Sequence, residues 1–290
     1  MKLRDIPIVT VGPGSQPADQ DGTQLEYIAM PSDMSTYRRP DIPALETITD
    51  LTGAREAMAW LQHALESYDL NAKPAAADLT RLDAGNRDLV NQILGEGEVS
   101  VKYSGAVRGR IQESLLAGVW RALYLDEEDR ITHDMLEVGD VPGLARILAD
   151  QCPVSMSELA RADAPPSVMN ARSILTELAA QCQAYQTDGT AHVVNLSLLP
   201  LSDEDLAFLD DTLGRGPVDI LSRSYGKCQI TSTLAPNVWW VRFYNSMSTL
   251  LLNSLEVVDV PLVACAAPED IADSRNRLRE IMDSYGNEMS

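Results

Sequence analysis

The sequence has little of the residue types that carry most protein chemistry. Only four of its 290 residues are cysteines, three are histidines, and 5% are aromatic. No CxxC pair, metal-type histidine spacing, HExxH or GxSxG string occurs. These absences exclude the common zinc-site and serine-hydrolase signatures. The widely spaced cysteines favour free thiols in a reducing cytoplasm, which is the localisation we expect.

Positive charge and long apolar runs are also scarce. The chain has 23 Lys and Arg against 43 Asp and Glu, a formal net charge of −20. Such a polyanion repels nucleic-acid phosphates and anionic lipid, so we expect neither as a partner. No apolar stretch approaches the length of a membrane span. The first apolar run is broken at Gly12-Pro13-Gly14, so we expect no signal peptide.

An internal repeat is the strongest pattern in the chain. LGEGEV begins at Leu94 and LGRGPV at Leu213, while LEVGDVP begins at Leu136 and LEVVDVP at Leu255. Each pair is 119 residues apart (213 − 94 and 255 − 136), and the same offset matches Trp120 with Trp239. The register holds without a gap between the two anchors, which predicts that one structural unit occurs twice.

Each copy has the same order of expected elements. An amphipathic helix, a short extended segment and a helix ended by the glycines of LGxG are followed by four short strands and a short closing helix. In the second copy the strands are VDILSRS, CQITST, VWWVRFY and TLLLNSLEVV. Short polar links between these strands predict antiparallel neighbours.

The expected fold is therefore α+β, with two homologous halves that are each an antiparallel meander sheet with covering helices. An extended N-terminal arm, rich in Gly, Pro, Asp and Gln, precedes them. We place the arm at residues 1–43, the first and more diverged repeat at 44–164, and the second repeat at 165–290. Whether the two halves share one sheet is left open by the sequence.

Cys228 is the candidate reactive thiol. It follows a tight turn at Gly226, and the neighbouring cations Arg223 and Lys227 would stabilise a thiolate and lower its pKa. Its repeat partner is Gly109, so the shared fold does not require a cysteine there. The alternative is that Cys228 only packs in a strand, as free cysteines usually do.

The strand Val238–Tyr244 supplies the candidate partner-binding residues. Trp239 has a repeat partner in Trp120 and is expected in the core, whereas Trp240 is matched by Arg121 and need not be buried. An exposed Trp-Arg-Tyr face has the composition of a protein-binding hot spot, and the alternative is that a helix covers it. The candidate partner-binding residues are Trp240, Arg242, Tyr244 and Tyr225.

Two pairs of carboxylates recur in both halves. Glu137 and Glu256 are repeat partners, and so are Asp140 and Asp259. Paired carboxylates can do acid–base work. Their presence in both copies favours a structural role instead, such as capping the helix that follows Val-Pro.

Several strings resemble the HupH/HyaF family of hydrogenase expression and formation proteins. They are LSRSYGKCQITST, NVWWVRFYNS and LEVVDVP, with VGPGSQP and YIAMPSDMSTYRRP resembling the family's opening. The resemblance implies a cytoplasmic accessory protein for maturation of an uptake [NiFe]-hydrogenase that helps the small, iron–sulfur subunit. It implies no settled reaction, so we expect neither an enzyme nor a bound cofactor.

Two functions from different classes follow. The first is a binding chaperone that holds the small-subunit precursor, and other maturation proteins are further expected partners. The alternative is a thiol-based carrier of iron, a cluster or a disulfide that uses Cys228. One cysteine cannot hold a cluster, so the carrier needs Cys152, Cys265 or a partner to supply further ligands.

Overall fold

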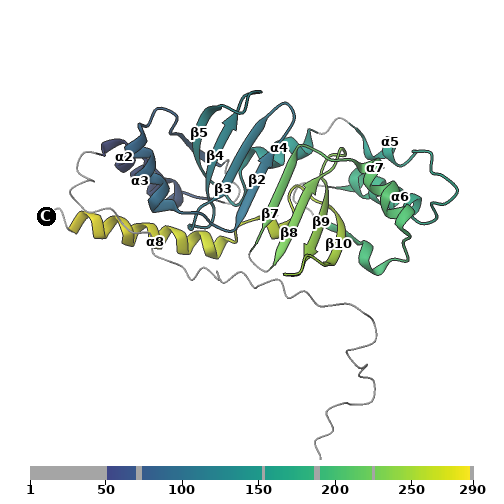
Figure 1. Cartoon of the computed structure of the whole chain (residues 1–290). Coiled ribbons are helices and arrows are strands. Elements are labelled where there is room, and N and C mark those ends of the chain that lie inside the picture. The colour runs from purple at the N-terminus through teal and green to yellow at the C-terminus, as the bar shows by residue number, and fades with distance from the viewer. Residues whose placement is uncertain (1–50, 70–73, 152–153, 186–189, 224–225, 288–290) are drawn as a thin grey trace, which may run out of the picture. The chain divides into compact units, whose positions relative to one another are not determined.

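The computed structural model describes residues 51–69, 74–151, 154–185, 190–223 and 226–287, with side chains up to residue 283 (Figure 1). The expected N-terminal arm lies outside these residues. In the described part of the chain, no helix is both long enough and apolar enough to cross a membrane.

Ten strands form one antiparallel sheet. Its order is β1-β5-β4-β3-β2-β7-β8-β9-β10-β6, so β2 to β5 and β7 to β10 are two meanders and each has a further strand at its outer edge. The first half contains β1 (Ala75–Asp78), β2 (Val99–Tyr103), β3 (Arg108–Glu113), β4 (Val119–Leu125) and β5 (Ile131–Val138). The second contains β6 (His192–Asn195), β7 (Val218–Ser222), β8 (Lys227–Ser232), β9 (Val238–Tyr244) and β10 (Leu250–Val257). The α+β class and the two homologous halves are confirmed. The string DLTRL at residues 78–82 predicts the first extended segment, but the strand β1 lies earlier, at Ala75–Asp78.

The two halves meet through the pairing of β2 with β7. Val101 lies opposite Ile220, and these two residues are repeat partners at the offset of 119 (220 − 101). Val99 lies opposite Ser222 and Tyr103 opposite Val218, so the same surface of each half contacts its counterpart. This is the self-complementary geometry of a twofold dimer interface, formed here within one chain.

Two pairs of helices cover the outer strands of one sheet face. The first half has α2 (Thr52–Glu66) and α3 (Ala84–Leu94), and the second has α6 (Ala171–Ala184) and α7 (Asp203–Leu213). The sequence predicts Ser202 as the N-cap of α7, and Ser202 and Asp205 form a reciprocal capping box there. Both α3 and α7 end at an LGxG glycine with positive φ, as predicted.

The opposite sheet face carries the core that the two halves share. Trp120 and Trp239 are fully buried there beside α4 (Gly143–Asp150). The indole Nε1 of Trp120 donates to the carbonyl oxygen of Gly139 at 2.8 Å, and that of Trp239 donates to the carbonyl oxygen of Val258 at 3.1 Å. The prediction that Trp239 is a core residue is confirmed.

The closing helices cross between the halves. Helix α5 (Met156–Leu159) follows the first half, yet Met156 packs in the cluster of α6 and α7. Helix α8 (Pro268–Asn287) follows the second half, yet Ile271 and Leu278 pack in the cluster of α2 and α3 (Figure 1). The string SMSE at Ser155 has the spacing of a capping box, and Ser155 and Glu158 form one at the start of α5. The expectation of two short closing helices is wrong for α8, because its apolar residues extend over several turns of a helix that spans the other half's core.

The crossed helix α8 makes a local prediction. Leu278 is fully buried against the first half, so Leu278→Ala should destabilise the protein by about 2–5 kcal/mol. Hydrogen exchange should show lost amide protection in α2 before α6. Asp283→Ala, at an exposed position of the same helix, is the control. Earlier loss in α6 would contradict the crossed packing.

Candidate functional site

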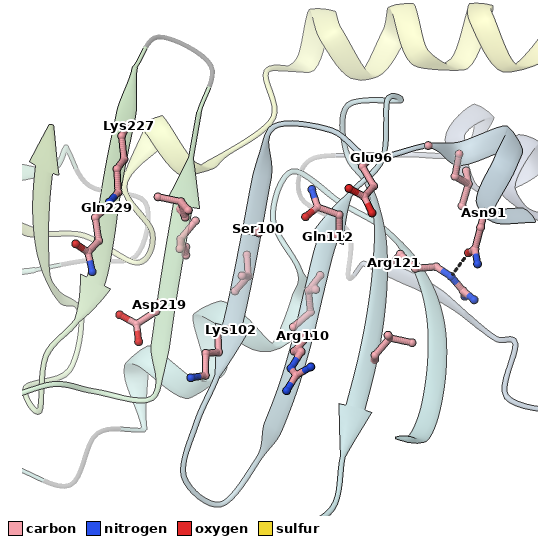
Figure 2. A pocket seen from close by; sticks show the side chains of 17 residues that line it. Asn91, Glu96, Ser100, Lys102, Arg110, Gln112, Arg121, Asp219, Lys227 and Gln229 are labelled. Carbon is pink, nitrogen blue, oxygen red and sulfur yellow. Dashed lines mark hydrogen bonds between the residues drawn. The ribbon is translucent and has the colours of Figure 1, made fainter. Parts of the chain in front are cut away.

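Among the residues that the structure describes, none of the helices covers one face of the four central strands. On β2, β3, β7 and β8 one side is buried in the shared core, with Val101, Ile111, Ile220 and Ile230 pointing into it. The other side is exposed or half-buried, because the helix pairs pack over the outer strands. It forms a cavity of about 810 Å³, which we call the central groove (Figure 2). Its polar lining includes Ser100, Lys102, Arg110, Gln112, Lys227 and Gln229.

Trp240 lies on the same sheet face but is covered. Its side chain is 4% exposed and packs in the cluster of α6 and α7, where Nε1 donates to Asn253 Oδ1. Of the two alternatives for this residue, the structure shows the covered one, so an exposed tryptophan hot spot is wrong here. The alternation of the strand predicts its face, but only the positions of α6 and α7 decide whether that face is covered.

Arg242 and Tyr244 lie beside the groove. The Arg242 guanidinium stands over the Trp240 ring, 4.1 Å from its centroid, and donates to Asp210 of α7 at 3.0 Å. Tyr244 is half-buried, and its ring centroid lies 5.6 Å from the Nζ of Lys227, a groove residue. Tyr225 lies outside the described residues. Arg242 and Tyr244 therefore lie next to the groove residues Gln229 and Lys227, although neither of them lines the groove.

Cys228 points into the opposite, buried face. Its side chain is 4% exposed. Burial, and to a smaller extent the negative charge of Glu256, raises the pKa of its thiol to about 12. The direction is opposite to the predicted one. Successive side chains of a strand point to opposite faces, so Lys227 lies on the groove side and does not stabilise a thiolate. The predicted stabilisation rested on the closeness of Lys227 and Cys228 in the sequence, which does not bring their side chains together.

A second cavity, of about 510 Å³, lies on the buried side of the sheet and is lined by both Cys228 and Cys265. Burial raises the pKa of Cys265 to about 12 and that of Cys182 to about 11. Cys152 is not among the described residues. Within the described ranges, no three His, Cys, Asp or Glu side chains are grouped so that they could hold a metal ion. The further ligands that a cluster carrier needs are therefore not assembled in that part of the chain.

The repeated carboxylates serve the fold. Glu137 Oε2 accepts a hydrogen bond from the backbone nitrogen of Gly143, the first residue of α4, at 3.1 Å, as the capping prediction requires. Arg146 donates to Asp140 at 2.7 Å and to Asp259 at 2.8 Å. One guanidinium thus joins two repeat-equivalent aspartates, and these two carboxylates stabilise the contact between the halves.

Glu113 is a buried acid that the sequence argument missed. Its side chain lines the second cavity and is 9% exposed, and Oε1 accepts from the backbone nitrogen of Gly118 at 3.3 Å. Burial raises the pKa of this carboxyl to about 7. The signal was present in the sequence, because Glu113 alternates with Ile111 and so faces the core.

Comparison with known proteins shows that this chain is similar to hydrogenase expression and formation proteins. The family model described as the HupH hydrogenase expression protein, C-terminal conserved region, matches twice, at residues 51–163 and 168–285. The hydrogenase expression/formation protein HoxQ of Cupriavidus necator is 43% identical over 97% of this chain and 98% of its own. The hydrogenase-1 operon protein HyaF of Escherichia coli is 32% identical over 93% and 94%. A solved structure, the hydrogenase expression protein HupH from Thiobacillus denitrificans, is 30% identical, with a TM-score of 0.38 over 40% of this chain and 96% of that one.

The buried carboxyl of Glu113 predicts a pH-dependent stability. The folded pKa of about 7 lies above the ordinary value of 4.5, so stability is full below pH 4.5 and is lost as the pH rises through 7. The loss amounts to about 3 kcal/mol. Glu113→Gln should therefore match the parent in acid and exceed its free energy of unfolding by about that amount above pH 7, in urea titrations.

Glu56→Gln is the control, because Glu56 is an exposed carboxyl of α2 that does not line this cavity. It should change the free energy of unfolding little at any pH. A difference between Glu113→Gln and the parent that stays constant with pH would contradict the burial of an ionisable Glu113.

Proposed function

The chain belongs to the HupH family of hydrogenase expression/formation proteins and has a role in hydrogenase maturation, and we propose that it fulfils this role by binding an immature hydrogenase subunit. The client we propose is the iron–sulfur small subunit of an uptake [NiFe]-hydrogenase, bound in the cytoplasm. Other maturation proteins are further candidate partners. The protein acts as a binding chaperone and not as an enzyme.

The central groove is the observation that carries this proposal. It offers about 810 Å³ of open space on rigid strands, with hydrogen-bonding side chains at its floor. Functional sites on rigid elements hold their geometry well, and clefts with a few fixed polar groups are typical binding sites. The polar side chains of the floor include Ser100, Gln112 and Gln229, which suit recognition better than bond chemistry.

The buried thiols support binding over the carrier alternative. Cys228, Cys265 and Cys182 all have raised pKa values, and the thiolate is the form that binds metal or attacks a disulfide. With its pKa raised by burial, the Cys228 thiol stays protonated at neutral pH. A carrier at Cys228 would have to open the core before it could act.

The proposal predicts that filling the groove abolishes client binding. Ser100 lies on the groove floor, so Ser100→Trp would occupy the space that the client needs. We expect recovery of the small-subunit precursor with tagged full-length protein from anaerobic cells to fall at least about tenfold, with a parallel loss of hydrogenase activity. Ser173→Trp, at an exposed serine of α6, is the control and should behave like the parent.

Normal recovery of the precursor with a folded Ser100→Trp protein would contradict the groove as the client site. Trp240→Ala is not a useful test of this surface, because Trp240 is a core residue whose loss would unfold α6 and α7.

Cys228→Ser separates the two functions. The binding proposal expects normal precursor recovery and near-normal hydrogenase activity, since serine is nearly isosteric and the thiol does no chemistry. Normal recovery with loss of hydrogenase activity would favour the carrier.

A further inference from the structure

Positive charge is concentrated in the central groove. The whole chain has 23 basic residues against 43 acidic ones. The groove lining reverses this balance, with the four cations Lys102, Arg110, Arg121 and Lys227 against the two acids Glu96 and Asp219. Two of the four lysines in the entire sequence line this one cavity. A local cationic site in a chain of net charge −20 is not a consequence of composition.

Lys102 and Arg110 are the cations that the fold leaves available. They lie directly opposite each other on β2 and β3, both exposed, at one end of the groove (Figure 2). Like charges in directly opposed strand positions destabilise a sheet. Among the residues that the structure describes, neither has a carboxylate oxygen within 4.0 Å. Two mutually repelling charges are thus kept without a counter-ion in the part of the fold that the structure describes.

The neighbouring charges are otherwise engaged. Arg121 pairs with the buried Asp134, with Nη1 2.6 Å from Oδ1. Asp219 lies opposite Lys102 on β7, but its Oδ1 accepts a hydrogen bond from Thr231 Oγ1 at 2.9 Å. Lys227, at the other end of the groove, is exposed and lies over the Tyr244 ring. The free positive charge therefore comes from Lys102 and Arg110, with Lys227 as a second anchor.

The repeat shows that this pair is dispensable for the fold. At the offset of 119, Lys102 corresponds to Leu221 and Arg110 to Gln229. Leu221 and Gln229 also lie opposite each other on adjacent strands, so the second half builds the same strand pair without charge. The charges are a feature of the first half alone, and their cost to the sheet needs an explanation outside the fold.

We propose that the Lys102–Arg110 end of the central groove binds an acidic segment of the client polypeptide. Neighbouring Asp or Glu side chains of that segment pair with Lys102 and Arg110, while Ser100 and Gln229 hydrogen-bond its backbone. A peptide with a few carboxylates meets this local charge without the dense phosphates that the rest of the chain repels. This inference rests on the proposed binding function and names the chemistry of the segment that is bound.

The direct test uses a fluorescein-labelled peptide of alternating glutamate and serine, with a glutamine-for-glutamate peptide as its neutral counterpart. Fluorescence anisotropy with the full chain at low salt should show binding of the acidic peptide only. Lys102→Ala/Arg110→Ala should weaken this binding about tenfold, as expected for two exposed ion pairs. Arg81→Ala/Arg161→Ala makes the same change in net charge at exposed positions away from the groove and should leave the affinity unchanged.

Equal weakening by the two double variants would overturn the proposal, because net charge alone would then explain the attraction. Equal binding of the neutral peptide would overturn it as well. So would tighter binding of a single-stranded DNA oligomer with the same sensitivity to Lys102→Ala/Arg110→Ala, which would assign the site to nucleic acid.

A photo-crosslinker in place of Gln229, which also lines the groove, then tests the client itself. In cells that express the hydrogenase operon, we expect the crosslinked client peptide to contain neighbouring Asp or Glu residues, and Lys102→Ala/Arg110→Ala to reduce its yield. A crosslinked client peptide without such residues would overturn the acidic segment but leave client binding in place. A tagged protein that recovers no hydrogenase subunit would instead overturn the proposed function.

Discussion

The antiparallel pairing of β2 with β7 is the contact on which the rest of the structure depends. Because each strand meets its own repeat counterpart, with Val101 opposite Ile220, the two meanders become one continuous sheet. The inner strands of both halves then lie at the centre of that sheet. The core that the two halves share fills one face of these strands. On the opposite face, the helix pairs cover only the outer strands. The central groove is therefore a direct consequence of joining two copies edge to edge.

The residues shared by the two copies are those that hold this arrangement. Trp120 and Trp239 donate to equivalent backbone carbonyls. The hydroxyl oxygens of Tyr68 and Tyr185 accept from the backbone nitrogens of Asp140 and Asp259 at 3.1 and 2.7 Å. Residues that differ between the copies make contacts that occur in only one half. Arg146 corresponds to Cys265, and it is the arginine that bridges Asp140 and Asp259 across the pseudo-twofold axis.

Much of this fold could be predicted from local signals. The strand boundaries, the capping boxes at Ser155 and Ser202, and the glycine stops at Gly95 and Gly214 are consequences of short-range chemistry. The pairing of β2 with β7 and the packing of α8 on the first half join residues far apart in the chain. Hydrophobic periodicity reports only local structure, so it predicts neither contact. For the same reason the face of Trp240 was predictable but its covering by α6 and α7 was not.

Covalent labelling of lysine amines most directly tests whether the uncovered face is the client site. Lys102 and Lys227 line the central groove, and the sequence has only two other lysines, Lys2 and Lys73, as references. The full chain would be labelled alone and when saturated with the purified small-subunit precursor. If the client binds in the central groove, the precursor protects Lys102 and Lys227 from modification. Equal labelling rates of these two amines in the free and bound protein would contradict it.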